Sequence, residues 1–249
     1  MTPLEAAGIV LAGVFAGGIN TVVGSGTLVT FPALLAVGFP PVVANVSNTL
    51  GLVPGSVTGA IGYRRELAGQ LPRLLRLGTA SLVGGAVGAV LLLVLPPGAF
   101  ETIVPVLIGL ALVLVVVQPW LSRKLSEWER HEHGGVALFA GVFAAGVYGG
   151  YFGAAQGVLL VGLMGILMTE TLQRINAVKN VLAAVVNLVS GVIFAFVAEV
   201  AWDAVALIAG GAIVGGMIGA KVGRKLSPTV LRGVIVVVGV TAIVQLLVR

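Results

Sequence analysis

Apolar positions in this chain form long continuous runs instead of the periodic stripes of a soluble helix. The runs cover about 4–36, 40–63, 73–95, 100–121, 136–168, 174–198, 203–222 and 229–248. Runs of roughly 17–25 apolar residues have the length that a membrane-spanning helix needs. The pattern therefore predicts an all-α polytopic membrane protein with about eight hydrophobic segments.

Two of these segments are too long to be single straight helices across a bilayer. Segments 4–36 and 136–168 each hold about 33 residues, or about 50 Å of helix, against a hydrocarbon core of about 30 Å. Each carries a glycine cluster near its middle, at 24–26 and at 149–157. Each is therefore predicted to be two short helices that meet at a glycine turn inside the membrane.

Composition agrees with the membrane assignment. Charged residues make up 9% of the chain, whereas a soluble domain carries about 25%. The absence of cysteine excludes thiolate metal ligands and disulfides. The net charge of +5 indicates topology and not nucleic-acid binding, because the basic residues gather at segment ends. The N-terminus has no basic region before its first apolar segment, so no cleaved signal peptide is expected.

The distribution of basic residues predicts orientation in the cell (inner) membrane. The joins at 96–101 and 199–203 contain acidic residues and no Lys or Arg. The joins between segments 2 and 3, 4 and 5, 5 and 6, and 7 and 8 are basic and should be cytoplasmic, with Arg64, Arg65, Arg73, Arg76, Arg123, Lys124, Arg130, Arg174, Lys221, Arg224, Lys225 and Arg232. Segment 136–168 must then leave and re-enter the cytoplasmic side, and by analogy both chain termini lie outside.

The two halves of the chain resemble each other at an offset of about 130 residues. GVFAGGI at 13–19 matches GVFAAGV at 141–147, and further matches pair Asn45, Asn48 and Gly59 with Asn176, Asn180 and Gly191. We interpret 1–121 and 136–249 as inverted repeats, each a broken hairpin plus three helices, joined by a cytoplasmic linker at 122–135. Inverted repeats with broken helices are a recurring transporter plan. The alternative is chance likeness between Gly/Val/Ala-rich helices.

Three stretches carry a recognisable combination of motifs: VGSGTLVTFPALL at 23–35, GVYGGYFGAAQGVLL at 146–160 and INAVKNVLAAVVNLVSGVIFAF at 175–196. Together they resemble the sulfite exporter TauE/SafE family, and the Asn-Ala-Val-Lys-Asn stretch is the most specific of them. The resemblance implies transport of sulfite, of an organosulfonate such as sulfoacetate, or of a related anion. Gln156 departs from the small residues that the family tends to have there, so substrate details are expected to differ.

Polar residues follow one face of each of two apolar segments. Asn45, Asn48, Thr49 and Ser56 share a stripe in 40–63, and Asn176, Lys179, Asn180, Asn187 and Ser190 share one in 174–198. Polar side chains in a bilayer turn inward, so both stripes are expected to face a shared substrate cavity. Hydrogen bonding between helices produces similar stripes and is the alternative.

Lys179 lies roughly 8 Å into its segment and has no carboxylate in the same segment. A bound sulfite or sulfonate would supply the missing anion. Snorkelling of the ammonium to the cytoplasmic headgroups is the equally weighted alternative.

The two glycine turns offer a second device for binding an anion. Ser25-Gly26-Thr27 and Ala155-Gln156-Gly157 lie where a short helix would begin after each break. Unpaired backbone N–H groups and the positive end of a helix dipole favour oxyanions. Close helix packing is the alternative reading of the glycines. Asn20 and Tyr148 are weaker candidates at matching repeat positions.

The chain lacks the residues of several other functions. Its nine acidic residues lie near segment ends or in loops, which argues against internal proton coupling and against an intramembrane catalytic pair. His131 and His133 fall in the charged linker, where solvation is expected instead of metal binding. We expect no cofactor, a small anionic substrate, a lipid bilayer as surroundings, and export by alternating access.

Three points stay open from the sequence alone. A sodium-coupled importer and a channel for another small anion are the alternative functions. The glycine-rich helices at 78–89 and 209–223 favour close packing, either within one chain or in a homo-oligomer.

Overall fold

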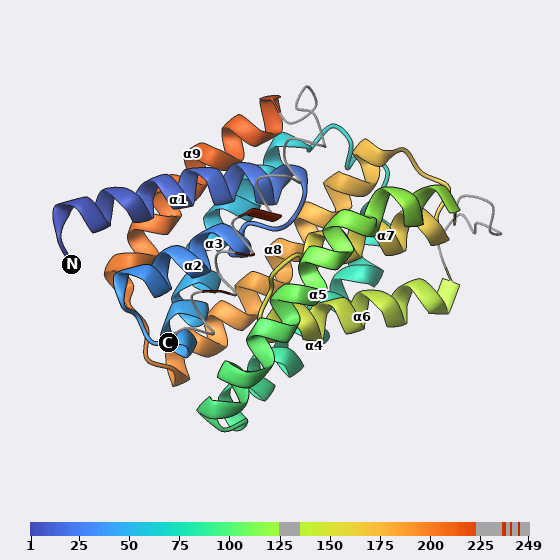
Figure 1. Ribbon diagram of the computed structural model, residues 1–249. Helices are drawn as coiled ribbons and strands as arrows, with labels where there is room; N and C mark the ends of the chain where they lie inside the picture. Colours follow the sequence, from blue (N-terminus) through green and yellow to red (C-terminus); the bar gives the residue numbers. More distant parts are fainter. Residues whose placement is uncertain (125–134, 223–235, 238–239, 241–243, 245–249) are drawn as a thin grey trace.

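The computed structural model describes residues 1–124, 135–222, 236–237, 240 and 244. Its helices are α1 (Pro3–Val22), α2 (Thr27–Val37), α3 (Pro41–Gly62), α4 (Leu71–Val94), α5 (Pro97–Lys124), α6 (Gly135–Tyr151), α7 (Gln156–Leu167), α8 (Leu172–Val197) and α9 (Trp202–Val222). The described part of the chain forms no strand (Figure 1). Most of the expected segment 229–248 and most of the linker at 122–135 lie outside the described residues.

Both long apolar segments are interrupted at their glycine clusters. Gly24 follows α1 with φ +89°, and Gly153 follows α6 with φ +75°. The amide of each glycine donates to the carbonyl five residues earlier, at Ile19 (3.1 Å) and Tyr148 (3.2 Å). A side chain at such a left-handed position is costly, which explains why the helices stop at glycine.

The arms of the two broken hairpins are unequal, which corrects the expectation of two short helices in each. Helix α1 has 20 residues, about 30 Å, and is long and apolar enough to cross a membrane by itself. Helix α2 has 11 residues and can reach only about half as far. Helices α6 and α7 have 17 and 12 residues. Helices α4, α8 and α9 are also long and apolar enough to span.

Helices α1, α3 and α9 run parallel to one another. On α1, Gly13 lies against Ile208 and Gly17 lies against Ala212. On α3, Gly51 and Gly55 face the same two residues of α9. Residue numbers rise together along all three helices, so their directions agree, and Figure 1 shows α1 beside α9. Glycine at these contacts lets the backbones approach closely, as in small-residue interfaces of membrane helices.

Helices α4, α6 and α8 form a second parallel trio. Gly84 lies against the backbone of Phe143 and Gly88 lies against that of Val147. Gly85 also contacts Val186 of α8, and its carbonyl accepts a hydrogen bond from the Ser190 hydroxyl (3.2 Å). Arg73 near the start of α4 pairs with Glu170 just before α8, so α4 and α8 run in the same direction. Helices α4 and α6 therefore pack closely at glycine residues, as α1 and α9 do.

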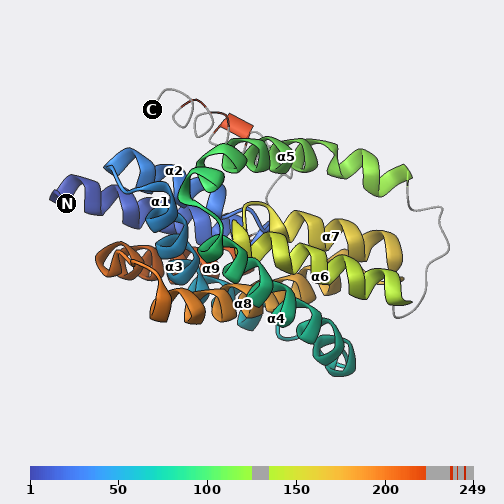
Figure 2. The ribbon, with the colours of Figure 1, turned by 90° about the horizontal axis from the view of Figure 1, so that it is seen from below.

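The two trios meet along α3 and α8, which are antiparallel. Leu50 near the middle of α3 contacts Gly191 in the last third of α8. Further along α3, the Asn187 amide donates to the Ser56 hydroxyl (3.4 Å). The short helices α2 and α7 pack against this pair, and α5 lies along one face against α7 (Figure 2).

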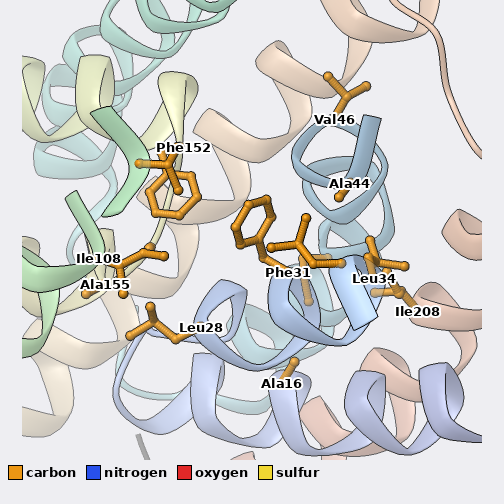
Figure 3. Close-up of a cluster of buried hydrophobic side chains, with 14 of the residues drawn as sticks. Ala16, Leu28, Phe31, Leu34, Ala44, Val46, Ile108, Phe152, Ala155 and Ile208 are labelled. Atoms are coloured by element: carbon orange, nitrogen blue, oxygen red, sulfur yellow. The ribbon is translucent and has the colours of Figure 1, made fainter. Parts of the chain in front are cut away.

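An aromatic cluster joins α2, α5 and the break after α6. The ring of Phe31 meets that of Phe152 edge to face at 5.2 Å, and both contact Phe100, at 6.4 and 6.0 Å. Figure 3 shows Phe31 and Phe152 pointing toward each other beside Leu28. Edge-to-face aromatic pairs stabilise by about 0.5–1.5 kcal/mol beyond their buried area. The cluster holds the second helix break against α2.

Candidate functional site

The two interrupted turns cross and touch through their backbones. The amide of Gly157 donates to the carbonyl of Gly24 at 3.0 Å. A Cβ atom on Gly157 would lie 2.4 Å from the Gly24 Cα, so no larger residue fits. Three residues further along, Thr27 lies beside Gly153. The turns after α1 and after α6 therefore run antiparallel in contact, and they bring the beginnings of α2 and α7 together.

Lys179 of α8 reaches into this crossing and is fully buried. Its aliphatic stem passes Gly157, where an added Cβ would come within 2.9 Å of Cδ. Its ammonium donates to the carbonyls of Asn20 (2.8 Å) and Thr21 (3.0 Å) in the last turn of α1. Carbonyls at a helix end lack helical partners and carry the negative end of the dipole. The snorkelling alternative is wrong, because the ammonium turns inward.

Two asparagines join Lys179 at the same helix end. The amides of Asn176 and Asn180 donate to the Thr21 carbonyl, at 3.1 and 3.3 Å. No carboxylate forms an ion pair with Lys179 among the residues that the structure describes. Within the described residues, the Lys179 side chain at the end of α1 is thus held by backbone carbonyls and not by a carboxylate.

The end of α6 is held in a related way but without a cation. Asn45 of α3 donates its amide to the Tyr151 carbonyl at 3.0 Å. Asn45 and Asn176 are each the fifth residue of their helices. In both, the side-chain oxygen Oδ1 is buried and has no hydrogen-bond partner within the described chain. The helix after each hairpin therefore caps the broken helix of the other half.

The beginnings of α2 and α7 present buried polar atoms without partners. Ser25 is fully buried, and its hydroxyl makes no hydrogen bond in the described structure. Gln156 is 3% exposed, and its Nε2 atom also makes no hydrogen bond in the described structure. The first backbone hydrogen bonds of α2 are donated by the amides of Leu28 and Val29. The preceding amides of Gly26 and Thr27 take no part in them. Buried polar atoms are nearly always paired, so unpaired ones at two adjoining helix starts indicate a ligand site.

Several expected site residues are occupied by contacts within the protein. The Gly157 amide, expected to be unpaired, is taken by Gly24. Asn48 donates to the Thr27 hydroxyl (3.1 Å) and accepts from that of Thr30. Asn20 donates to Ser56 (3.1 Å). Of the polar stripes, Asn48, Asn187 and Ser190 make hydrogen bonds between helices, as the alternative interpretation of the stripes expected.

Some groups of the candidate site cannot be recognised from side chains, because they belong to the backbone. The Thr21 carbonyl accepts hydrogen bonds from Lys179 and Asn176, and the Tyr151 carbonyl accepts one from Asn45. The signal was present, since every interrupted helix must leave unpaired carbonyls at its end. The Tyr148 hydroxyl donates to the Ala154 carbonyl and shapes the second turn without facing a ligand.

A separate charged cluster ties the α3–α4 link to the α7–α8 link. Glu170 accepts from Arg73 (2.9 Å) and from Arg174 (2.8 Å). Partial burial raises the pKa of the Glu170 carboxyl, but the hydrogen bonds and charges of the two arginines outweigh burial and lower it. The described residues contain no group of three His, Cys, Asp or Glu side chains that could hold a metal ion.

Comparison with known proteins identifies a family. The family model of the sulfite exporter TauE/SafE matches residues 9–246. The chain is 27% identical over 227 residues to a probable membrane transporter protein of Haemophilus influenzae, covering 90% of this chain and 88% of the relative. It is 26% identical over 249 residues to the probable membrane transporter protein YfcA of Escherichia coli K12, covering 99% and 91%.

A third relative is the probable membrane transporter protein ORF9 of a Sinorhizobium species, 25% identical over 248 residues, with 95% of this chain and 90% of the relative covered. No solved structure matches the chain. The match to the family model extends over nearly the whole chain and includes both broken hairpins. The chain is therefore a multi-pass membrane transporter that belongs to the sulfite exporter TauE/SafE family.

Proposed function

We propose that this transporter moves a sulfur-containing oxyanion, sulfite or an organosulfonate such as sulfoacetate, out of the cell across the inner membrane. The observation that carries the proposal is the convergence of a buried, carboxylate-free ammonium with two unpaired donors at crossed helix starts. These groups are Lys179, Ser25 and Gln156. A sulfonate or sulfite group has three oxygens and a negative charge, which match several N–H and O–H donors near one cation.

The dipoles of the short helices support binding of an anion at this crossing. The amides of Gly26 and Thr27 precede the first backbone hydrogen bonds of α2, and helix starts carry partial positive charge. At the start of α7 only the dipole contributes, because the amides of Gln156 and Gly157 donate to Gly153 and Gly24. Lys179 covers the negative end of α1, which would otherwise repel an anion at the neighbouring start of α2. In this proposal Ser25, Gly26, Thr27 and Gln156 contact the substrate. Lys179 supplies charge from behind, and Asn45, Asn176 and Asn180 hold the helix ends.

The two parallel trios support an inverted-repeat transporter. Helices α1, α3 and α9 correspond to α6, α8 and α4, and the trios are antiparallel along α3 and α8. We assign the Glu170 cluster to the cytoplasmic side and the N-terminus to the outside. Rocking of one trio against the other about the crossed turns would give alternating access. The membrane potential favours exit of an anion by about 2.3 kcal/mol per charge per 100 mV, so export needs no coupled ion.

Binding to the purified protein in detergent tests the substrate assignment. Sulfite, sulfoacetate, taurine, sulfate and thiosulfate are compared by calorimetry and by thermal stabilisation. Selective binding of sulfite or a sulfonate is the expected result. Binding of none of them would refute the sulfur-anion assignment and leave the family membership standing.

Substitution of Lys179 tests the location. For a separation taken as roughly 8 Å between the ammonium and the anion, and an effective dielectric constant of about 20, loss of the charge removes about 2 kcal/mol, or about thirtyfold in affinity. Lys179→Met should show this loss and Lys179→Arg, which keeps the charge, should recover most of it. Lys221→Met removes an exposed lysine at the end of α9 and serves as the matched control. Equal affinity of Lys179→Met and wild type would remove the lysine from the site.

A further inference from the structure

The two helix breaks are built alike, yet among the described residues a cationic side chain reaches only the first of them. At the end of α1, the Lys179 ammonium and the amide of Asn176 share the terminal carbonyls. At the end of α6, the amide of Asn45 binds the terminal carbonyl of Tyr151. Lys179 is the eighth residue of α8, and the eighth residue of α3 is Asn48. Asn48 is engaged by Thr27 and Thr30, so it brings nothing to the end of α6.

The end of α6 therefore combines a negative dipole end with an unpaired acceptor. Asn45 is fully buried, and its Oδ1 has no donor in the described structure. A buried acceptor next to helix-end carbonyls is a ligand set of neutral hard oxygens. We propose that a small monovalent cation, sodium, binds at the end of α6 through Asn45 Oδ1 and the carbonyls at the end of α6, at the position related to the Lys179 ammonium.

The neutral oxygen ligands at this site favour a monovalent cation over a divalent one. Divalent cations in proteins are held by carboxylates, and the described residues contain no cluster of acidic or histidine side chains. Neutral carbonyl and amide oxygens suit a monovalent ion, and transporters with broken helices use such helix ends for sodium. The first break shows the same preference within this molecule, since a monovalent ammonium is bound there by two carbonyls.

The cation has a consequence for the anion that rests on the proposed transport function. An oxyanion at the crossing lies near the negative ends of both α1 and α6. Lys179 covers the first end permanently, whereas sodium covers the second only when it is bound. Sodium should therefore strengthen anion binding, by roughly tenfold if the coupling is of ordinary size, and the anion must strengthen sodium binding by the same factor.

The experiment measures both ligands on the purified wild-type protein and two matched variants. Thermal stabilisation is recorded with sodium chloride and with N-methyl-D-glucamine chloride at equal ionic strength, without and with sulfite or sulfoacetate. Asn45→Ala and Asn176→Ala each remove one amide donor from a helix end and one unpaired acceptor. Their costs in stability should be similar, so the pair controls for structural damage.

The expected result is stabilisation by sodium in the wild type and in Asn176→Ala, with the response lost in Asn45→Ala. No difference between sodium and N-methyl-D-glucamine in the wild type would overturn the proposal, and so would equal loss of the response in both variants. Anion binding that is indifferent to sodium would leave the proposed function intact and refute this inference. Sodium binding at Asn45 without binding of any sulfur anion would support the sodium site and refute the proposed sulfur-anion transport.

Discussion

Replacement of Gly157 by alanine tests whether the two turns are in contact as tightly as the structure has them. The added Cβ would lie 2.4 Å from the Gly24 Cα, 3.0 Å from its carbonyl oxygen and 2.9 Å from Cδ of Lys179. Two of these neighbours are backbone atoms, which cannot rotate away. The turns must separate, and the hydrogen bond from Gly157 to Gly24 is then stretched or lost.

The expected cost follows from three contributions. Overpacking costs about 1–3 kcal/mol. Loss of the hydrogen bond costs about 1 kcal/mol. Alanine stabilises a helix by roughly 0.5–1 kcal/mol relative to glycine, which offsets part of this cost. The free energy of unfolding of Gly157→Ala should therefore fall by about 1–3 kcal/mol.

Gly162 in the same helix provides a matched control. A Cβ at this position meets nothing within 4 Å, so Gly162→Ala should gain roughly 0.5–1 kcal/mol from helix propensity alone. The two variants should thus differ by about 2–4 kcal/mol. Denaturant unfolding in one detergent measures this difference, and sulfite binding reports on the site. Stabilities that agree within about 0.5 kcal/mol would refute the turn-to-turn contact.

Two further predictions use positions outside this contact. Gly24→Ala should destabilise by about 1–3 kcal/mol more than Gly38→Ala, because both have positive φ but only Gly24 is blocked, by Gly157; equal unfolding midpoints would contradict this. Glu170→Gln should lower the midpoint at pH 7. The ionised carboxylate favours the folded state above its unfolded pKa of about 4.3, and the stabilisation is lost as pH falls through the lowered pKa of the native state. A gap between variant and wild type that is unchanged at pH 3 would argue against the ion pairs.

The sequence alone was sufficient for the features that depend on length and local chemistry. Segments of 33 apolar residues exceed the bilayer, and glycine clusters mark where such helices can stop, so both breaks were predictable at Gly24 and Gly153. The Asn-Ala-Val-Lys-Asn stretch singled out α8 as a candidate for the substrate site, and the structure brings its lysine to the crossing of the turns.

Pairings between distant residues were decided only by the tertiary structure. Asn48 and Asn45 lie on one stripe, yet Asn48 is saturated by two threonines while Asn45 keeps an unpaired oxygen. Periodicity tells which face of a helix a residue occupies but not which atoms of another helix lie opposite. Likewise, the sequence presented Lys179 as a cation in need of an anion, while the fold gave it the carbonyls of α1. Helix ends expose backbone groups that every residue shares, so no pattern of side chains reveals which partner will reach them.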